Sequence, residues 1–391
     1  MKLKLIISAL LMLVSVTVFA EELQTVEPRL INALNKIKLE RIDDALTDVE
    51  DLLNTTPQFH LAQLVYADLL MAKAGLPQQL GLPPARPGNT RVDELRYEAK
   101  VRWQRYQEKL NQDQLPDVLL QLSDKQETAV VVDLSRSRLY LFENKGKGPR
   151  MLADFYVTQG KNGKDKRIEG DEKTPLGTYF VTSSLDVAKL PDLYGTGAFP
   201  IDYPNAWDRR QGKTGHGIWL HGVPSNTYSR APLATRGCLA MSNSELDSIK
   251  PFLHSGATPV IIASQLNWVD TEQLGRDAGS LKKRMAQWLA DWQSRDVDAY
   301  LDYYSRSFRS DAKDYSAWAE HKQRVNQHKE FIKVTLSDVS ILRYPDQSSD
   351  MVVVSFEQDY RSNNFNGKSR KRQYWQKEAD GQWRIIYEGK G

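Results

Sequence analysis

The sequence predicts a multidomain protein in three successive parts: a helical N-terminal region, a β-rich middle domain and an α+β C-terminal domain. Two patterns indicate this division. Apolar residues recur at helical spacing up to about residue 125, and short strand-like runs follow between 128 and 262. Beyond residue 280, helical spacing returns and is followed by further strand-like runs. The 391 residues, 40% of them hydrophobic, are enough for two or three hydrophobic cores.

The charge balance excludes several classes of protein. Charged residues make up 26% of the chain, too many for a polytopic membrane protein, and 9% aromatic residues argue against a disordered chain. The 53 basic and 50 acidic residues give a formal net charge of +3. Because this charge is close to zero, we expect no nucleic acid among the partners.

The first twenty residues have the pattern of a secretory signal peptide. Two lysines precede an apolar run that ends at Phe19, and the small residue Ala20 stands before two glutamates. An uncleaved membrane anchor is the alternative interpretation. We expect residues 1–20 to be removed and the mature chain to be exported to the periplasm or the cell envelope.

Residues 21–125 are expected to be helical, in two stretches. Apolar residues from Leu61 to Leu69 follow the three-and-four spacing of an amphipathic helix. A segment rich in Gly and Pro at 75–88 interrupts the pattern, and helical spacing resumes after it. Since no repeat recurs at a fixed period, we interpret this region as a helical cap on the next domain.

Residues 126–265 are expected to form the β-rich domain. The runs 129–133 and 139–142 flank a short polar turn and predict a β-hairpin. A loop rich in Gly and Lys follows at 160–173, and the apolar run 259–262 predicts a last strand. Long loops between short strands are where binding and catalytic residues concentrate.

Residues 280–391 are expected to form the C-terminal domain, with two helices before four strands. The second helix is predicted over 297–304, and the basic cluster 368–372 is predicted to be an exposed hairpin end. The four strand-like runs are 332–336, 351–360, 372–377 and 383–387. This order resembles the cone-like fold of nuclear transport factor 2. We expect the domain to serve binding or assembly, such as homodimer formation, rather than chemistry.

Cys238 is the only cysteine of the chain. In an exported protein it has no partner for an intramolecular disulfide, so the thiol is either buried and inert or chemically active. His221 lies upstream, and an imidazole beside a thiol is the minimal unit for acyl transfer, because the base removes the proton that the nucleophile loses. Gly237 leaves the approach to the sulfur open, and the backbone N–H groups of Gly237 and Cys238 are candidates for an oxyanion hole.

A zinc site built from His216, His221 and Cys238 is an alternative use of these side chains. On a strand the two histidines, five residues apart, face opposite sides, and no closely spaced fourth ligand follows. We therefore expect neither a metal nor an organic cofactor.

The order of these motifs resembles the L,D-transpeptidases of the YkuD type, whose hallmark is a His-Gly pair followed by Ser or Thr, a basic residue, Gly and the catalytic Cys. The matching residues are His221-Gly222 and Thr235-Arg236-Gly237-Cys238. A Thr-Pro-Leu-Gly-Thr-Tyr-Phe segment at 174–180 also agrees with the family. The resemblance covers about a third of the chain, roughly 128–264. It implies a mixed β-sandwich fold and activity outside the cytoplasm.

The resemblance also implies the roles of single residues. Cys238 matches the nucleophile, His221 matches the general base, and Gly222 matches the residue whose backbone carbonyl orients the imidazole. The residues that we place in the substrate pocket are Arg236, Trp219 and Asn243.

The chain departs from the family at one position. Many members carry an arginine two residues after the cysteine, where this chain has Ala240. That change affects recognition of the substrate carboxylate or the choice of acyl acceptor. The segment 199–210 and the appended C-terminal domain look like a subgroup that contains peptidoglycan-trimming L,D-carboxypeptidases.

The resemblance implies action on peptidoglycan stem peptides, through a Cys238 thioester and release of a terminal D-amino acid. Transfer of the acyl group to an amine is the L,D-transpeptidase reaction, which we rank first. Transfer to water is the L,D-carboxypeptidase reaction, which trims tetrapeptide to tripeptide. An alternative of another class is a non-catalytic peptidoglycan-binding module. Either enzyme would act in cell wall organisation and cell shape.

The expected chemistry predicts the response to inhibitors. Because nucleophile and base are both side chains, activity should survive EDTA and be lost on treatment with iodoacetamide or on oxidation of Cys238. Turnover measured before and after each treatment checks this expectation. Activity lost to EDTA and restored by added zinc would favour the metal site instead.

Overall fold

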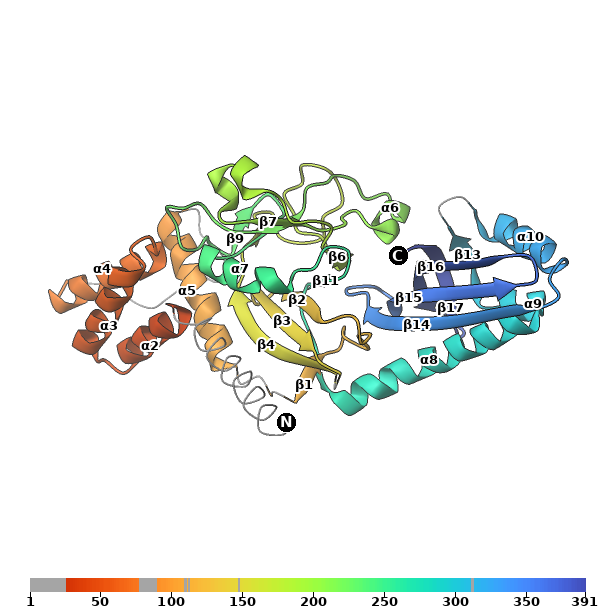
Figure 1. Cartoon of the computed structure of the whole chain (residues 1–391). Helices are drawn as coiled ribbons and strands as arrows, with labels where there is room; N and C mark the ends of the chain where they lie inside the picture. Colours follow the sequence, from red (N-terminus) through yellow and green to blue (C-terminus); the bar gives the residue numbers. More distant parts are fainter. Residues whose placement is uncertain (1–25, 77–89, 109–110, 112, 147, 311–312) are drawn as a thin grey trace, which may run out of the picture.

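The computed structural model describes residues 26–76, 90–108, 111, 113–146, 148–310 and 313–391. Its three parts follow one another along the molecule: helices at one end, a β domain in the middle, and a sheet with a long helix beneath it at the other end (Figure 1). The predicted fold class is confirmed. The predicted signal segment, residues 1–20, lies outside the described residues. Within the part that is described, no helix is long and apolar enough to cross a membrane.

Four helices form the N-terminal part, in agreement with the predicted helical region. They are α2 (Val26–Lys38), α3 (Ile42–Thr55), α4 (His60–Lys73) and α5 (Arg91–Gln107). Their apolar faces meet in one hydrophobic core. Tyr228, from a loop of the middle domain, inserts into this core with its ring centroid 4.6 Å from that of Phe59. The helices therefore pack directly on the middle domain.

A five-stranded sheet in the order β4-β3-β2-β11-β6 is the framework of the middle domain. Its strands are β2 (Thr128–Asp133), β3 (Arg138–Asn144), β4 (Pro149–Tyr156), β6 (Gly177–Phe180) and β11 (Pro259–Ala263). The predicted hairpin of β2 and β3 is confirmed. Every residue of β2 is buried, with Val131 facing one hydrophobic core and Val130 and Val132 facing another. Because both faces of the sheet are covered, this strand is an apolar run rather than an alternating one.

A smaller sheet in the order β10-β8-β7 lies beside the first. Its strands are β7 (Ala198–Pro200), β8 (Trp219–His221) and β10 (Leu239–Ala240). The other short strands are β1 (Gln114–Pro116), β5 (Gln159–Gly160), β9 (Leu233–Thr235) and β12 (Trp268–Asp270). The short helices are α6 (Ala206–Arg210), α7 (Asn243–Ile249), η1 (Val187–Lys189), η2 (Asp192–Tyr194) and η3 (Lys250–Phe252).

The C-terminal domain is a five-stranded sheet in the order β13-β17-β16-β15-β14, with α8 running beneath it (Figure 1). Its helices are α8 (Thr271–Ser294), α9 (Val297–Leu301) and α10 (Tyr315–Asn326). Its strands are β13 (Tyr304–Arg309), β14 (Ile332–Arg343), β15 (Met351–Ser362), β16 (Asn366–Lys377) and β17 (Trp383–Lys390). The four predicted strands are present.

Three details of this domain differ from the prediction. Tyr304, expected to end the second helix, begins strand β13. Helix α10 was not expected, because none of its residues is fully buried and it lacks a strong apolar face. The cluster 368–372 is not simply an exposed hairpin end: Arg372 Nη1 pairs with Asp202 at 3.0 Å, and its guanidinium lies 4.0 Å from the Phe180 ring centroid.

One hydrophobic core runs from the middle domain into the C-terminal domain. It begins on the central sheet with Val131 and Tyr140, continues through α8 with Trp288 and reaches Trp375 of the C-terminal sheet. The rings of Trp288 and Trp375 meet edge to face, with centroids 6.3 Å apart. The two domains are therefore one packed unit.

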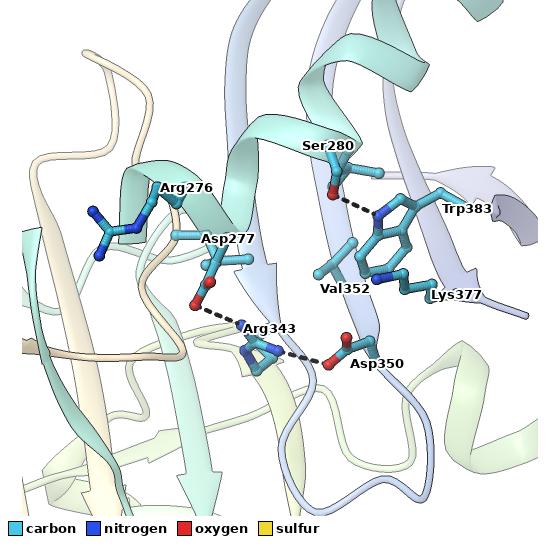
Figure 2. A pocket seen from close by; sticks show the side chains of 10 residues that line it. Arg276, Asp277, Ser280, Arg343, Asp350, Val352, Lys377 and Trp383 are labelled. Carbon is cyan, nitrogen blue, oxygen red and sulfur yellow. Dashed lines mark hydrogen bonds and ion pairs between the residues drawn. The ribbon is translucent and has the colours of Figure 1, made fainter. Parts of the chain in front are cut away.

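A hollow of about 220 Å³ lies at this junction. In it, Arg343 lies between Asp277 of α8, at 3.4 Å, and Asp350, at 2.8 Å (Figure 2). On another wall, Trp383 Nε1 donates a hydrogen bond to Ser280 Oγ at 3.1 Å (Figure 2). Because these polar groups satisfy one another, we interpret the hollow as part of the domain junction.

The helical region is tied to the middle domain by a buried ion-pair network around Glu27. Its carboxylate lies 2.7 Å from the guanidinium of Arg102 in α5 and 2.7 Å from that of Arg138 in β3. Burial by itself raises the pKa of Glu27, but the two guanidiniums outweigh this effect and hold the pKa at about 2. The charge of Glu27 therefore stabilises the contact between the two parts.

We predict that Glu27→Gln destabilises the protein by about 3 kcal/mol, because it removes the carboxylate that two buried guanidiniums share and leaves only Glu98 beside Arg102 and Asp154 beside Arg138. The stabilisation by a carboxyl of lowered pKa is fully present above the unfolded value, about 4.5, and is lost as the pH falls toward about 2. Denaturation midpoints measured from pH 7 to pH 2 should therefore converge for wild type and variant at the acid end. Glu50→Gln, on the exposed face of α3, is the matched control; an equal effect of both substitutions would contradict the prediction.

Candidate active site

The parallel pairing of β8 and β10 brings the histidine and the cysteine together. Ala240 pairs with His221 and Leu239 pairs with Leu220. Cys238 immediately precedes β10, so it lies at the end of that strand, next to the residue pair that begins the ladder. Cys238 follows His221 by seventeen positions along the chain, but the paired strands place it one residue before the ladder that His221 ends.

The ring of His221 is oriented by its neighbour. Nδ1 lies 2.6 Å from the carbonyl oxygen of Gly222, and because that oxygen only accepts, Nδ1 carries the proton and Nε2 is left as the base. The residue is buried, and burial lowers the pKa of His221 to about 4; the Gly222 hydrogen bond opposes this shift, while the cation of Arg230 adds to it. The imidazole is therefore neutral over the physiological range.

An aromatic residue that the sequence does not single out completes the surroundings of His221. Tyr194, in η2, meets the imidazole edge to face at 5.1 Å between centroids and lies 4.8 Å from the ring of Trp219. Its carbonyl oxygen also accepts a hydrogen bond from the Gly222 N–H at 3.1 Å. No motif marks Tyr194, because a loop distant in sequence supplies it.

The thiol of Cys238 is half-buried and donates to the carbonyl oxygen of Gly217 at 3.3 Å. Burial raises the pKa of Cys238, and this is only partly opposed by the backbone N–H of Trp219 and by the cations of Arg230 and Lys166. The resting pair is thus a neutral thiol and a neutral imidazole. Such a pair transfers its proton during nucleophilic attack rather than before it.

A hydroxyl group holds the turn that presents the sulfur. Thr235 Oγ1 donates to the carbonyl of Cys238 at 2.7 Å and accepts from the N–H of Gly237 at 3.1 Å. Gly237 has φ +114°, and a Cβ there would lie 2.6 Å from the Lys173 carbonyl oxygen, so only glycine fits. Since its N–H already has a partner, Gly237 differs from the expected oxyanion donor, and the N–H of Cys238 is the one that remains of that pair.

The three residues predicted to line the substrate pocket lie in different surroundings. Arg236 is exposed, and Trp219 is half-buried against Tyr194. Asn243 instead holds the loop behind His221: its Oδ1 accepts from the N–H of Val223 at 3.1 Å, and its Nδ2 donates to the Val223 carbonyl at 2.9 Å. Its amide is therefore used within the protein, as a positioning group.

His216 does not join the other two members of the considered zinc site. It is exposed, with Nε2 3.8 Å from Glu169, whereas His221 is buried. Among the residues that the structure describes, no three His, Cys, Asp or Glu side chains are grouped as metal ligands would be.

Comparison with known proteins agrees with this site. The family profile of the L,D-transpeptidase catalytic domain, YkuD, matches residues 127–262, and that of the Cds6 C-terminal NTF2-like domain matches residues 280–389. The solved structure of Bd1075 from Bdellovibrio bacteriovorus is 30% identical, with a TM-score of 0.63 over 71% of this chain and 98% of its own. The chain therefore belongs to the YkuD family of L,D-transpeptidases, in a form with a C-terminal NTF2-like domain.

Two further relatives share parts of this architecture. Pgp2 of Campylobacter jejuni, a helical cell shape determining protein, is 28% identical, with a TM-score of 0.57 over 67% of this chain and 91% of its own. YafK of Escherichia coli K12, named as an L,D-transpeptidase, is 29% identical over 116 residues, which are 29% of this chain and 42% of YafK. The match thus spans less than half the length of this curated relative.

The neutral resting pair predicts a distinct pH dependence. Because the pKa of His221 is lowered to about 4, the base should stay competent well below pH 6 and fail only as the pH approaches 4. Because the pKa of the thiol is raised from 9.0, alkylation by iodoacetamide should be slow at pH 7 and accelerate above pH 9. NMR titration of the imidazole, with His216→Ala for assignment, and alkylation rates across pH check both points. A preformed ion pair, with fast alkylation at pH 6, would contradict them.

Proposed function

We propose that the protein is an exported cysteine acyltransferase that acts on peptidoglycan stem peptides. The observation that carries this proposal is the fixed tautomer of His221, with Nδ1 held by the Gly222 carbonyl at 2.6 Å, on a strand that pairs in parallel with the strand that Cys238 precedes. Membership of the L,D-transpeptidase family supports the substrate class.

The proposed reaction starts from the neutral pair. The Cys238 sulfur attacks the carbonyl carbon of the penultimate diamino acid while its proton passes to His221 Nε2. The backbone N–H of Cys238 stabilises the oxyanion. The tetrahedral intermediate collapses to a thioester, and the terminal D-amino acid leaves with the proton from the imidazolium. An acceptor then attacks the thioester, giving its proton to Nε2, and the thiol is restored.

An amine acceptor gives the L,D-transpeptidase reaction, which the family membership favours. A second candidate is the L,D-carboxypeptidase reaction, with water as acceptor. The observation in its favour is Ala240, which is buried opposite His221 where many transpeptidases have an arginine. The thioester is common to both reactions.

We propose a binding or assembly role for the C-terminal domain, including homodimer formation. In this domain Lys322 Nζ lies among aromatic rings, 4.4 Å from the ring centroid of Trp318 and 5.0 Å from that of Trp292. Burial lowers the pKa of Lys322 to about 8, and Glu388 opposes this shift. A partly desolvated ammonium among rings suits recognition of an anionic or polar ligand. The likeness to Pgp2 supports a role in cell shape.

The product spectrum tests the proposed reaction. Purified protein incubated with muropeptide tetrapeptides should release the terminal D-amino acid, and mass spectrometry should detect cross-linked or exchanged products. Tripeptide alone would assign water as the acceptor and reverse our ranking.

Cys238→Ala should abolish turnover, because the thioester cannot form. The matched control is Ser225→Ala, which changes an exposed side chain of the loop between β8 and β9. Retained turnover in Cys238→Ala would contradict the mechanism, and retention of muropeptide without any change of mass by the wild type would assign a binding module.

A further inference from the structure

Because position 240 holds alanine and not arginine, the residue that binds the substrate carboxylate must come from another part of the chain. A stem peptide that loses its last residue ends in a carboxylate, and consecutive Cα atoms are only about 3.8 Å apart. That carboxylate therefore lies close to the scissile bond. Ala240, in the small sheet, offers no positive charge to receive it.

Two cations act on the reacting groups from elsewhere in the chain. Lys166 and Arg230 both favour the thiolate form of Cys238, and Arg230 also disfavours protonation of His221. Lys166 is committed to its own loop, because its Nζ donates to Asp171 at 2.8 Å and to the carbonyl of Ile168 at 2.9 Å. Arg230 is also placed beside the site by the backbone: Thr158, whose Oγ1 donates to the Arg230 carbonyl at 3.0 Å, pairs with Ala240, two residues after Cys238.

The guanidinium of Arg230 has donors to spare. One of its N–H groups, at Nη2, donates to the carbonyl of Ala234 in β9, the strand that leads into the Cys238 turn. A guanidinium has five N–H donors. Within the described part of the chain no Asp or Glu forms an ion pair with Arg230, although the side chain is half-buried and burial lowers its pKa. A partly desolvated guanidinium with open donors suits bidentate binding of a carboxylate.

The backbone that presents Arg230 is fixed from two sides. Its carbonyl oxygen accepts hydrogen bonds from Tyr156 Oη at 2.9 Å and from Thr158 Oγ1 at 3.0 Å, both in the middle domain. The preceding residue, Ser229, donates from Oγ to Glu98 of α5 at 2.7 Å. The N-terminal helices thus help to hold the segment that carries the cation, which keeps the guanidinium near the thiol without an ion pair of its own.

We infer that Arg230 binds the terminal carboxylate of the stem peptide and so determines specificity for substrates that end in a free carboxylate. This inference rests on the proposed function, since it assigns a contact for the same substrate class. The residue takes over, from a different loop, the charge that Ala240 does not supply.

The test compares a muropeptide tetrapeptide with the same peptide carrying a terminal carboxamide. For wild type, kcat/KM should be higher for the carboxylate. Arg230→Ala should lower kcat/KM for the carboxylate about 100-fold, mostly through KM, with a much smaller change for the amide. Arg230→Lys should restore part of the preference. The ratio of kcat/KM for the two substrates is unaffected by any effect of Arg230 on the reactivity of the thiol, because both substrates react with the same nucleophile.

A second measurement separates this inference from the proposed reaction. Binding of both peptides to Cys238→Ala, by calorimetry, needs no turnover, and Cys238→Ala with Arg230→Ala should lose the preference for the carboxylate. Arg150→Ala, an exposed arginine of β4, is the control in the same background. An unchanged carboxylate preference after Arg230→Ala overturns the inference even when the enzyme is active. Carboxylate-dependent binding through Arg230 in a protein without turnover upholds the inference and overturns the proposed reaction.

Discussion

Two short parallel strands, β8 and β10, must stay paired for His221 and Cys238 to remain close to one another. A ladder of two residue pairs is too short to be stable alone, so other contacts must hold it. Asn243 holds the chain that leaves β8, by binding both backbone groups of Val223. Thr235 holds the turn that enters β10. Gly237, in the same turn, must be glycine because a Cβ there would lie 2.6 Å from the carbonyl oxygen of Lys173. Each contact constrains backbone rather than side chain, which suits a site that needs fixed geometry.

The helical N-terminal region is part of this support rather than a separate module. Tyr228 and Ser229 of the site loop contact the helices, one through the hydrophobic core and one through Glu98. The ion pairs of Glu27 connect the same helices to the central sheet. Buried charges of this kind are costly to leave unpaired, so the contact is specific as well as strong. The position of this loop, and with it the electrostatic effect of Arg230 on the Cys238 thiol, depends on helical residues more than a hundred positions earlier in the chain.

The C-terminal domain is joined to the middle domain by a continuous core. Val131 of the central sheet belongs to the same hydrophobic core as Trp288 and Trp375 of the C-terminal domain. Arg343 adds a polar contact across the junction, since its Nε donates to the carbonyl of Asp117 at 3.3 Å. Because the opposite face of that sheet packs toward the small sheet and its loops, the C-terminal domain completes the framework on which the site is built.

The sequence by itself determined the three-part division and the β2–β3 hairpin, because these follow from local periodicity, and it singled out Cys238 and His221 as candidate site residues from their residue types and order. It missed β13, which is defined by its pairing with the distant strand β17, and α10, which has no fully buried residue and no strong apolar face. Only the tertiary structure decided that the N–H of Gly237 is occupied, that the Tyr194 ring contacts the imidazole of His221, and that Thr158 holds Arg230 beside Ala240. Those contacts join separate loops, and no spacing along one chain encodes which loop will lie beside which strand.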